Sequence, residues 1–153
     1  MEMKRPLTRR ERIGYEGENL AIKILERESF CNIRKLGGPC DFLAEKEGNL
    51  YLIDVKASTV NKRKLPVHDH SLVDLINLCK AMKAKPLILV LKPSRYNFVD
   101  PFRLLQETSS RDVCLYKCYL RKGLYKDIEE MLELRKDRVK YLLNYLTFKL
   151  ENS

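Results

Sequence analysis

Two aspartates and one lysine stand out because of where they fall along two segments with strand-like composition. Asp41 opens the first segment, and Asp54 and Lys56 come near the end of the second, LYLIDVK. Side chains two residues apart on a strand point to the same face, so Asp54 and Lys56 share one. If the two strands form a hairpin that closes at Gly48-Asn49, its twist can bring Asp41 beside Asp54.

Two carboxylates that converge at a strand end make a hard oxygen site, which suits Mg²⁺, with Mn²⁺ as the alternative. Such a metal polarises a phosphate and helps to generate hydroxide from water. Lys56 beside it can orient that water or stabilise charge developing on phosphorus. The competing interpretation is that Asp54 and Lys56 are ordinary solvent-facing charges, which the apolar neighbours Ile53 and Val55 leave open. A charge on a covered strand face is costly without a partner, and this favours a site.

The elements that must position these residues follow from hydrophobic periodicity and turn signals. We expect helices at 11–29, 69–83 and 101–106, strands at 31–36, 41–46, 50–56, 86–91 and 96–99, and a C-terminal helix at 125–150. A polar, basic loop is expected at 57–66, and 111–120 is ambiguous. The order α-β-β-β-α-β, followed by the C-terminal helix, predicts an α/β fold in which helices flank a mixed sheet.

Length and charge set the broad class of the protein. The 153 residues fit one domain spanning 1–153, with residues 1–10 as a flexible basic arm. The net charge of +9 favours a polyanionic partner such as nucleic acid. No apolar run reaches the roughly 18 residues of a membrane span, and no apolar segment follows the basic N-terminus as in a signal peptide. A cytoplasmic protein without a membrane partner is therefore expected. The five cysteines are odd in number and irregularly spaced, which favours free thiols.

The two motifs together resemble the PD-(D/E)xK nuclease superfamily. Pro39-Cys40-Asp41 matches its first half and Asp54-Val55-Lys56 its second, with aspartate where glutamate is commoner. The chain looks more specifically like the archaeal Holliday junction resolvases over about residues 11–100. Those begin with a helix that carries a catalytic glutamate. Glu18 takes that position here, and Glu16 is the second candidate.

The resemblance implies a restriction-endonuclease-like fold and a Mg²⁺-dependent endonuclease that cleaves branched DNA, above all four-way junctions. It implies that Glu18, Asp41 and Asp54 hold the metal and that Lys56 positions or activates the nucleophile. Symmetric nicking of a junction requires two sites, so a homodimer is expected. Two alternatives remain open: another nuclease of the superfamily with a repair, restriction-like or single-strand substrate, and a non-catalytic nucleic-acid-binding protein of the same fold.

Basic residues near the expected site are the candidates for phosphate contact. They are Arg9, Arg10, Arg12, Arg34, Lys62, Arg63 and Lys64. On the C-terminal helix, Tyr141, Tyr145 and Phe148 can form a base-stacking platform, although at helical spacing we favour a core or oligomer contact.

Overall fold

The computed structural model describes residues 9–60, 65–106, 118–121 and 128–152, and all structural statements concern these residues. The helices are α1 (Arg9–Arg27), α2 (Asp69–Met82), α3 (Pro101–Gln106), α4 (Ile128–Leu134) and α5 (Arg138–Glu151). The strands are β1 (Cys31–Lys35), β2 (Phe42–Lys46), β3 (Asn49–Ala57), β4 (Leu65–His68), β5 (Lys85–Lys92), β6 (Arg95–Val99) and β7 (Cys118–Arg121). Within the described ranges, no helix is long and apolar enough to span a bilayer.

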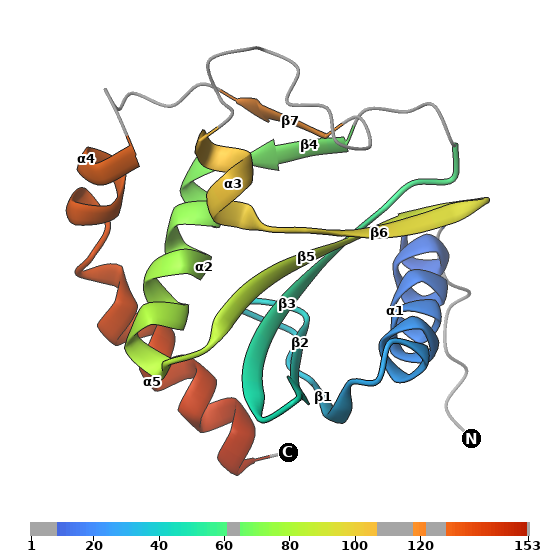
Figure 1. Ribbon diagram of the computed structural model, residues 1–153, viewed down its shortest axis with the longest axis horizontal. Coiled ribbons are helices and arrows are strands. Elements are labelled where there is room, and N and C mark those ends of the chain that lie inside the picture. The colour runs from blue at the N-terminus through green and yellow to red at the C-terminus, as the bar shows by residue number, and fades with distance from the viewer. Residues whose placement is uncertain (1–8, 61–64, 107–117, 122–127, 153) are drawn as a thin grey trace, which may run out of the picture.

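Five strands form one mixed sheet in the order β1-β2-β3-β5-β6. Strands β3 and β5 are parallel, because α2 carries the chain back across the sheet between them, and the other neighbours are antiparallel. Figure 1 shows α1 on one side of this sheet and α2 and α5 on the other. The predicted mixed sheet with flanking helices is therefore confirmed.

The predicted hairpin is formed by β2 and β3, and its turn lies at Glu47-Gly48, one residue before the expected Gly48-Asn49. Phe42 pairs with Ile53 and Lys46 with Asn49. The turn between them has positive φ at both Glu47 (52°) and Gly48 (78°), as the tight turns that suit the twist of a β-hairpin require. The pairing places Asp41, one residue before β2, opposite Asp54.

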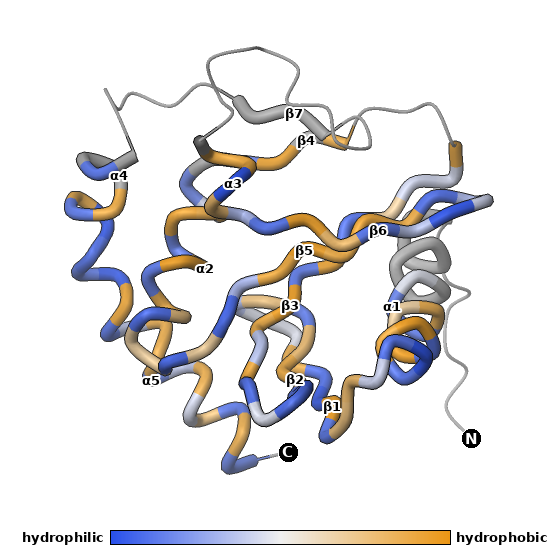
Figure 2. The backbone as a smooth tube through the Cα atoms, viewed as in Figure 1, coloured by the Kyte–Doolittle hydropathy of each residue, from blue (hydrophilic) through white to orange (hydrophobic). Residues whose placement is uncertain are grey.

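Alternation along the hairpin divides its side chains between two cores. Phe42 and Ile53 face α1 and pack with Leu25 and Leu89. On the opposite face, Leu43 and Leu52 pack with Leu75, Leu78 and Leu146 from α2 and α5. Figure 2 shows the hydrophobic middle strands lying between these helical layers. By the same alternation, Asp41, Asp54 and Lys56 belong to the face that α2 and α5 cover.

A bidentate ion pair fastens the C-terminal region to α2. Arg135 places Nε 2.7 Å from Asp74 Oδ1 and one terminal nitrogen 2.8 Å from Oδ2, and Arg138 Nε lies 3.3 Å from the same Oδ2. Asn77 also donates a 2.9 Å hydrogen bond to the carbonyl of Leu132. The C-terminal region is therefore an integral part of the domain rather than an appended tail.

Three features differ from the sequence-based expectation. The parallel pair β4–β7 was not predicted, since β4 falls partly in the expected loop and β7 in the ambiguous stretch. Residues 125–127 of the predicted helix 125–150 lie outside the described part, and the rest forms two helices, α4 and α5, with turns at 135–137. Helix α1 begins at Arg9 and so includes the last two residues of the predicted flexible arm, whose residues 1–8 lie outside the described part.

Candidate active site

Asp41 is held by hydrogen bonds to the strands on both sides of it. Its backbone N–H donates to the carbonyl of Ile53 (3.1 Å), and its own carbonyl accepts from the N–H of Leu36 (2.8 Å). The side chain adds a third bond, because Oδ2 accepts from the backbone N–H of Val55 at 2.6 Å. These bonds fix the carboxylate of Asp41 against β3.

Asp54 and Lys56 form an ion pair on the middle strand β3. Lys56 Nζ lies 3.0 Å from Asp54 Oδ2, and both side chains are about two-thirds buried, with exposures of 33% and 28%. On the edge of β3 away from β2, pairing with β5 fixes their backbone positions, with Asp54 opposite Ile88 and Lys56 opposite Val90. A central strand paired on both edges is a rigid support for these side chains.

The local field at Asp41 opposes its ionisation. Burial, together with the hydrogen bond and negative charge of Asp54, raises the pKa of Asp41 from 3.8 to about 7, and the Val55 N–H and the Lys56 charge offset only part of this. The single lysine therefore does not neutralise the two carboxylates. A divalent cation between them would remove the repulsion, so this pair fits a hard metal ion with two protein oxygens and further water or phosphate ligands.

The loop before Asp41 is anchored at both ends in the core beneath α2 and α5. Leu36 and Cys40 are buried there, and burial raises the pKa of the Cys40 thiol well above its usual range, so it acts as an apolar residue. Between them, Gly38 has a φ of 137°, a backbone conformation that residues other than glycine rarely adopt. A Cβ added at Gly38 would lie 3.5 Å from the ring of Tyr145, so α5 closes over this loop.

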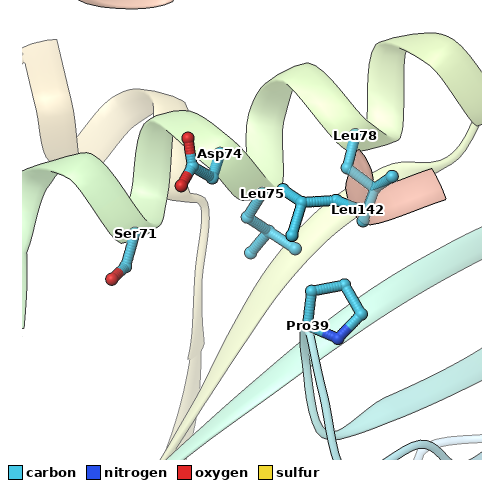
Figure 3. Close-up of a pocket in the computed structure, with 6 residues that line it drawn as sticks. All are labelled: Pro39, Ser71, Asp74, Leu75, Leu78 and Leu142. Atoms are coloured by element: carbon cyan, nitrogen blue, oxygen red, sulfur yellow. The ribbon is translucent and has the colours of Figure 1, made fainter. Parts of the chain in front are cut away.

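A small pocket separates the same loop from α2. Its lining residues are Pro39, Ser71, Asp74, Leu75, Leu78 and Leu142. Figure 3 shows the leucines between Pro39 and α2, with Ser71 and Asp74 at the polar end. The loop that leads to Asp41 thus meets α2 and α5 at this pocket.

Glu18 is the one predicted metal ligand that the structure does not place against the other two. Its carboxylate Oε2 lies 2.5 Å from Lys35 Nζ of β1. Within the part of the chain that the structure describes, no three His, Cys, Asp or Glu side chains gather closely enough to hold a metal. Helix α1 nevertheless reaches the end of β3, since a Cβ on Gly17 would lie 3.5 Å from Ala57 Cβ. A metal-binding role for Glu18 stays a prediction, and the side chain of Glu16 lies outside the described part.

The structure describes only some of the residues that were predicted to contact phosphate. Arg34 is exposed on β1, opposite Leu43. Arg9, Arg10 and Arg12 lie in the first turns of α1, but their side chains are not described, and Lys62, Arg63 and Lys64 fall outside the described residues. Contact with nucleic acid stays a prediction for all seven.

Two contacts in the site were not foreseen from the sequence. The donor to Asp41 is the backbone N–H of Val55, which every residue type except proline carries, so composition gives no sign of it. Lys35, the partner of Glu18, is one of many lysines, and only the packing of α1 against β1 selects it.

The comparisons with known proteins identify the family. Residues 9–143 match the sequence model of the archaeal Holliday junction resolvases (Hjc). The chain belongs to this family. The Hjc resolvases are nucleases of the PD-(D/E)xK superfamily, so the resemblance carried by the two motifs is confirmed. The family match ends within α5, before Tyr145.

A solved structure agrees with this assignment at the level of the fold. Hjc from Archaeoglobus fulgidus, a Holliday junction resolvase from an archaeal hyperthermophile, aligns with a TM-score of 0.53 and 18% identity, covering 63% of this chain and 84% of that one. A search of curated proteins returned no match.

Proposed function

We propose that this protein is a metal-dependent endonuclease that cleaves phosphodiester bonds in branched DNA, with the four-way junction as its principal substrate. Membership of the Hjc family supports the substrate. The observation that carries the chemistry is the convergence of Asp41, Asp54 and Lys56, with two carboxylates close enough for one to raise the pKa of the other.

Asp41 and Asp54 are the proposed metal ligands, and Mg²⁺ is the proposed ion, with Mn²⁺ as a substitute. The carboxylates of Asp41 and Asp54 supply hard oxygen donors on a rigid hairpin. When bound, such an ion stabilises negative charge on the scissile phosphate and lowers the pKa of a water ligand. Asp41 must be ionised to serve, so bound metal and a proton on Asp41 exclude one another.

Lys56 is the proposed group that positions the nucleophile and stabilises charge in the transition state. The ion pair with Asp54 holds its ammonium group over the same face of β3. It can donate hydrogen bonds to an attacking water or to a nonbridging phosphate oxygen. Glu18 is the proposed third carboxylate, which requires its contact with Lys35 to open, and Glu16 is its alternative.

The active form is proposed to be a homodimer. A four-way junction is resolved by two symmetric nicks, and the hairpin described above provides one set of Asp41, Asp54 and Lys56 for each chain. A twofold axis through the junction would then relate two such sites.

The test is cleavage of a panel of DNAs with Mg²⁺: a four-way junction, a splayed-arm duplex, a linear duplex and a single strand. We expect paired nicks in the junction, and loss of cleavage in Asp54→Asn and Lys56→Ala. Glu47→Gln is the matched control, since Glu47 is exposed at the opposite end of the same hairpin. Equal cutting of linear DNA would favour another nuclease specificity, and binding without metal-enhanced cleavage would favour a non-catalytic protein.

A further inference from the structure

One flank of α5 presents aromatic rings to solvent beside the candidate active site. Tyr141 and Phe148 are 68% and 60% exposed, and Tyr145 between them is 37% exposed. At 3.6 residues per turn, positions 141, 145 and 148 lie on one face of the helix. The opposite face, with Leu142, Leu146 and their neighbours, packs into the core. We call the three rings the aromatic stripe.

The stripe has no structural role that explains all three rings. Burial of α5 is accomplished by leucines, and Arg135 and Arg138 fasten the region to Asp74. Contiguous exposed apolar surface on a folded domain marks an interaction site. The stripe also extends past residue 143, where the match to the Hjc family ends.

The charges around the stripe indicate what occupies it. Lys149 lies four residues after Tyr145 on the same flank of the helix, and its Nζ sits 5.4 Å from the centre of the Tyr145 ring. Arg138, seven residues before Tyr145, is paired with Asp74, and its side chain is still 54% exposed. The one acidic residue of α5 is Glu151, at its end. Rings interleaved with cations match the bases and phosphates of a DNA strand, whereas a twofold contact between two copies would bring these like charges together.

The stripe is continuous with the cleavage site. Tyr145 packs on Gly38, which is three residues before Asp41. Three residues span at most about 11 Å, the length of roughly three stacked bases at about 3.4 Å each. The stripe and the carboxylate pair also lie on the same side of the sheet, the side that α2 and α5 cover.

We propose that the aromatic stripe Tyr141, Tyr145 and Phe148 stacks against unpaired or unstacked bases of a DNA strand whose neighbouring phosphodiester lies at Asp41 and Asp54. This assignment rests on the proposed function and adds a specificity-determining surface to it. Open bases occur at branch points and not in an intact duplex. The stripe therefore favours branched DNA over linear DNA.

The experiment compares Tyr141→Ala/Phe148→Ala with wild type for binding in EDTA, where no metal is present for cleavage. The probes are a four-way junction and a splayed-arm duplex, each with 2-aminopurine at the branch, and a linear duplex. Base stacking on one ring corresponds to about a 5- to 150-fold change in Kd. We expect the double variant to bind both branched probes at least about ten-fold more weakly and the linear duplex within about two-fold of wild type, with loss of the 2-aminopurine quenching that wild type produces.

Two controls separate stacking from other effects. Tyr141→Phe/Phe148→Tyr keeps both rings and should bind as wild type does. Leu134→Ala removes an equally exposed apolar side chain of α4 outside the stripe and should also leave binding unchanged. Circular dichroism and the mass in solution are measured for every variant. Unchanged affinity for the branched probes, an equal loss on all probes, or a change in oligomeric state would each overturn the proposal, the last because it would make the stripe a contact between copies.

Cleavage with Mg²⁺ is measured in parallel so that the two proposals can fail separately. A wild type that cuts junctions, with a double variant that binds and cuts equally well, would refute the stripe alone. A wild type that quenches 2-aminopurine through the stripe but never cuts would refute the nuclease assignment alone.

Discussion

Replacing Asp41 by asparagine is expected to stabilise the protein while abolishing its activity. The ionised form of Asp41 is disfavoured in the folded state, since its pKa rises from 3.8 to about 7. Between these two pH values the folded protein still binds a proton that the unfolded chain has lost. The free energy of unfolding therefore falls as pH rises through this window and stays at its lower value above about pH 7.

The size of this effect follows from the shift. At about 1.36 kcal/mol for each pKa unit, a rise from 3.8 to about 7 corresponds to at most about 4 kcal/mol. Because the carboxylate is partly exposed and shares its protons with Asp54, we expect about 2 kcal/mol. Asparagine removes the charge but keeps an oxygen that can accept the Val55 N–H. The free energy of unfolding of Asp41→Asn should thus exceed that of wild type by about 2 kcal/mol at about pH 8 and should equal it near pH 4.

The assay is urea unfolding in EDTA at several pH values between about 4 and 8, repeated with Mg²⁺. If unfolding is followed by heating instead of urea, a difference of about 2 kcal/mol in a domain of this size corresponds to a change in Tm of roughly 4–8 °C. Mg²⁺ should stabilise wild type at about pH 8 and leave Asp41→Asn unaffected. Glu26→Gln, an exposed carboxylate of α1, is the control and should follow wild type throughout. If Asp41→Asn is less stable than wild type at about pH 8, or retains the same pH dependence, the reasoning about the carboxylate pair is refuted.

Three further outcomes are expected. Lys56→Ala should lower the rate of junction cleavage by about 100-fold or more, while the affinity for the junction changes by less than about three-fold. A parallel loss of affinity would contradict the proposed role of Lys56 in the transition state. The control is Lys85→Ala, because Lys85 is exposed at the start of β5. Glu18→Gln should lower cleavage by about 100-fold and Glu16→Gln by only a few-fold, as measured by single-turnover kinetics, and the reverse order would assign the helix carboxylate to Glu16. In urea unfolding, Asp74→Asn should lower the free energy of unfolding by about 2–3 kcal/mol, because Arg135 and Arg138 lose their partner. The control is Asp137→Asn, at an exposed carboxylate beside the start of α5, which should change this free energy by less than about 0.5 kcal/mol.

The hairpin of β2 and β3 could be predicted from the sequence because the signals that indicate it are local. The strand-like composition of LYLIDVK and the glycine at position 48 predict the hairpin, whereas the exact register, with the turn at Glu47-Gly48, places Asp41 opposite Asp54 and comes from the structure. The same holds for β5, whose continuous apolar run predicts a strand covered on both faces.

Long-range contacts determine the features that the sequence did not reveal. The strand β4 pairs with β7, more than fifty residues away, and neither strand is long enough to show a period of its own. The turns between α4 and α5 occur without glycine or proline. The backbone N–H groups of Lys136 and Arg138 donate there to carbonyls three residues back, and Asn77 takes the Leu132 carbonyl. Arg135 reaches Asp74 from the same turn. The position of Glu18 likewise depends on how α1 packs against β1, which no local pattern encodes.

The division of α5 into a buried and an exposed flank also bears on how substrate preference can change over evolution. Leu146 and its neighbours must fill the core beneath the Gly38 loop, so substitutions there cost stability before they alter activity. Tyr141 and Phe148 carry no such constraint, because solvent surrounds them. The outer residues of α5 can therefore be exchanged over evolution without disturbing the core or the hairpin of β2 and β3, and, if the proposed stacking holds, each exchange would alter which DNA shapes are preferred.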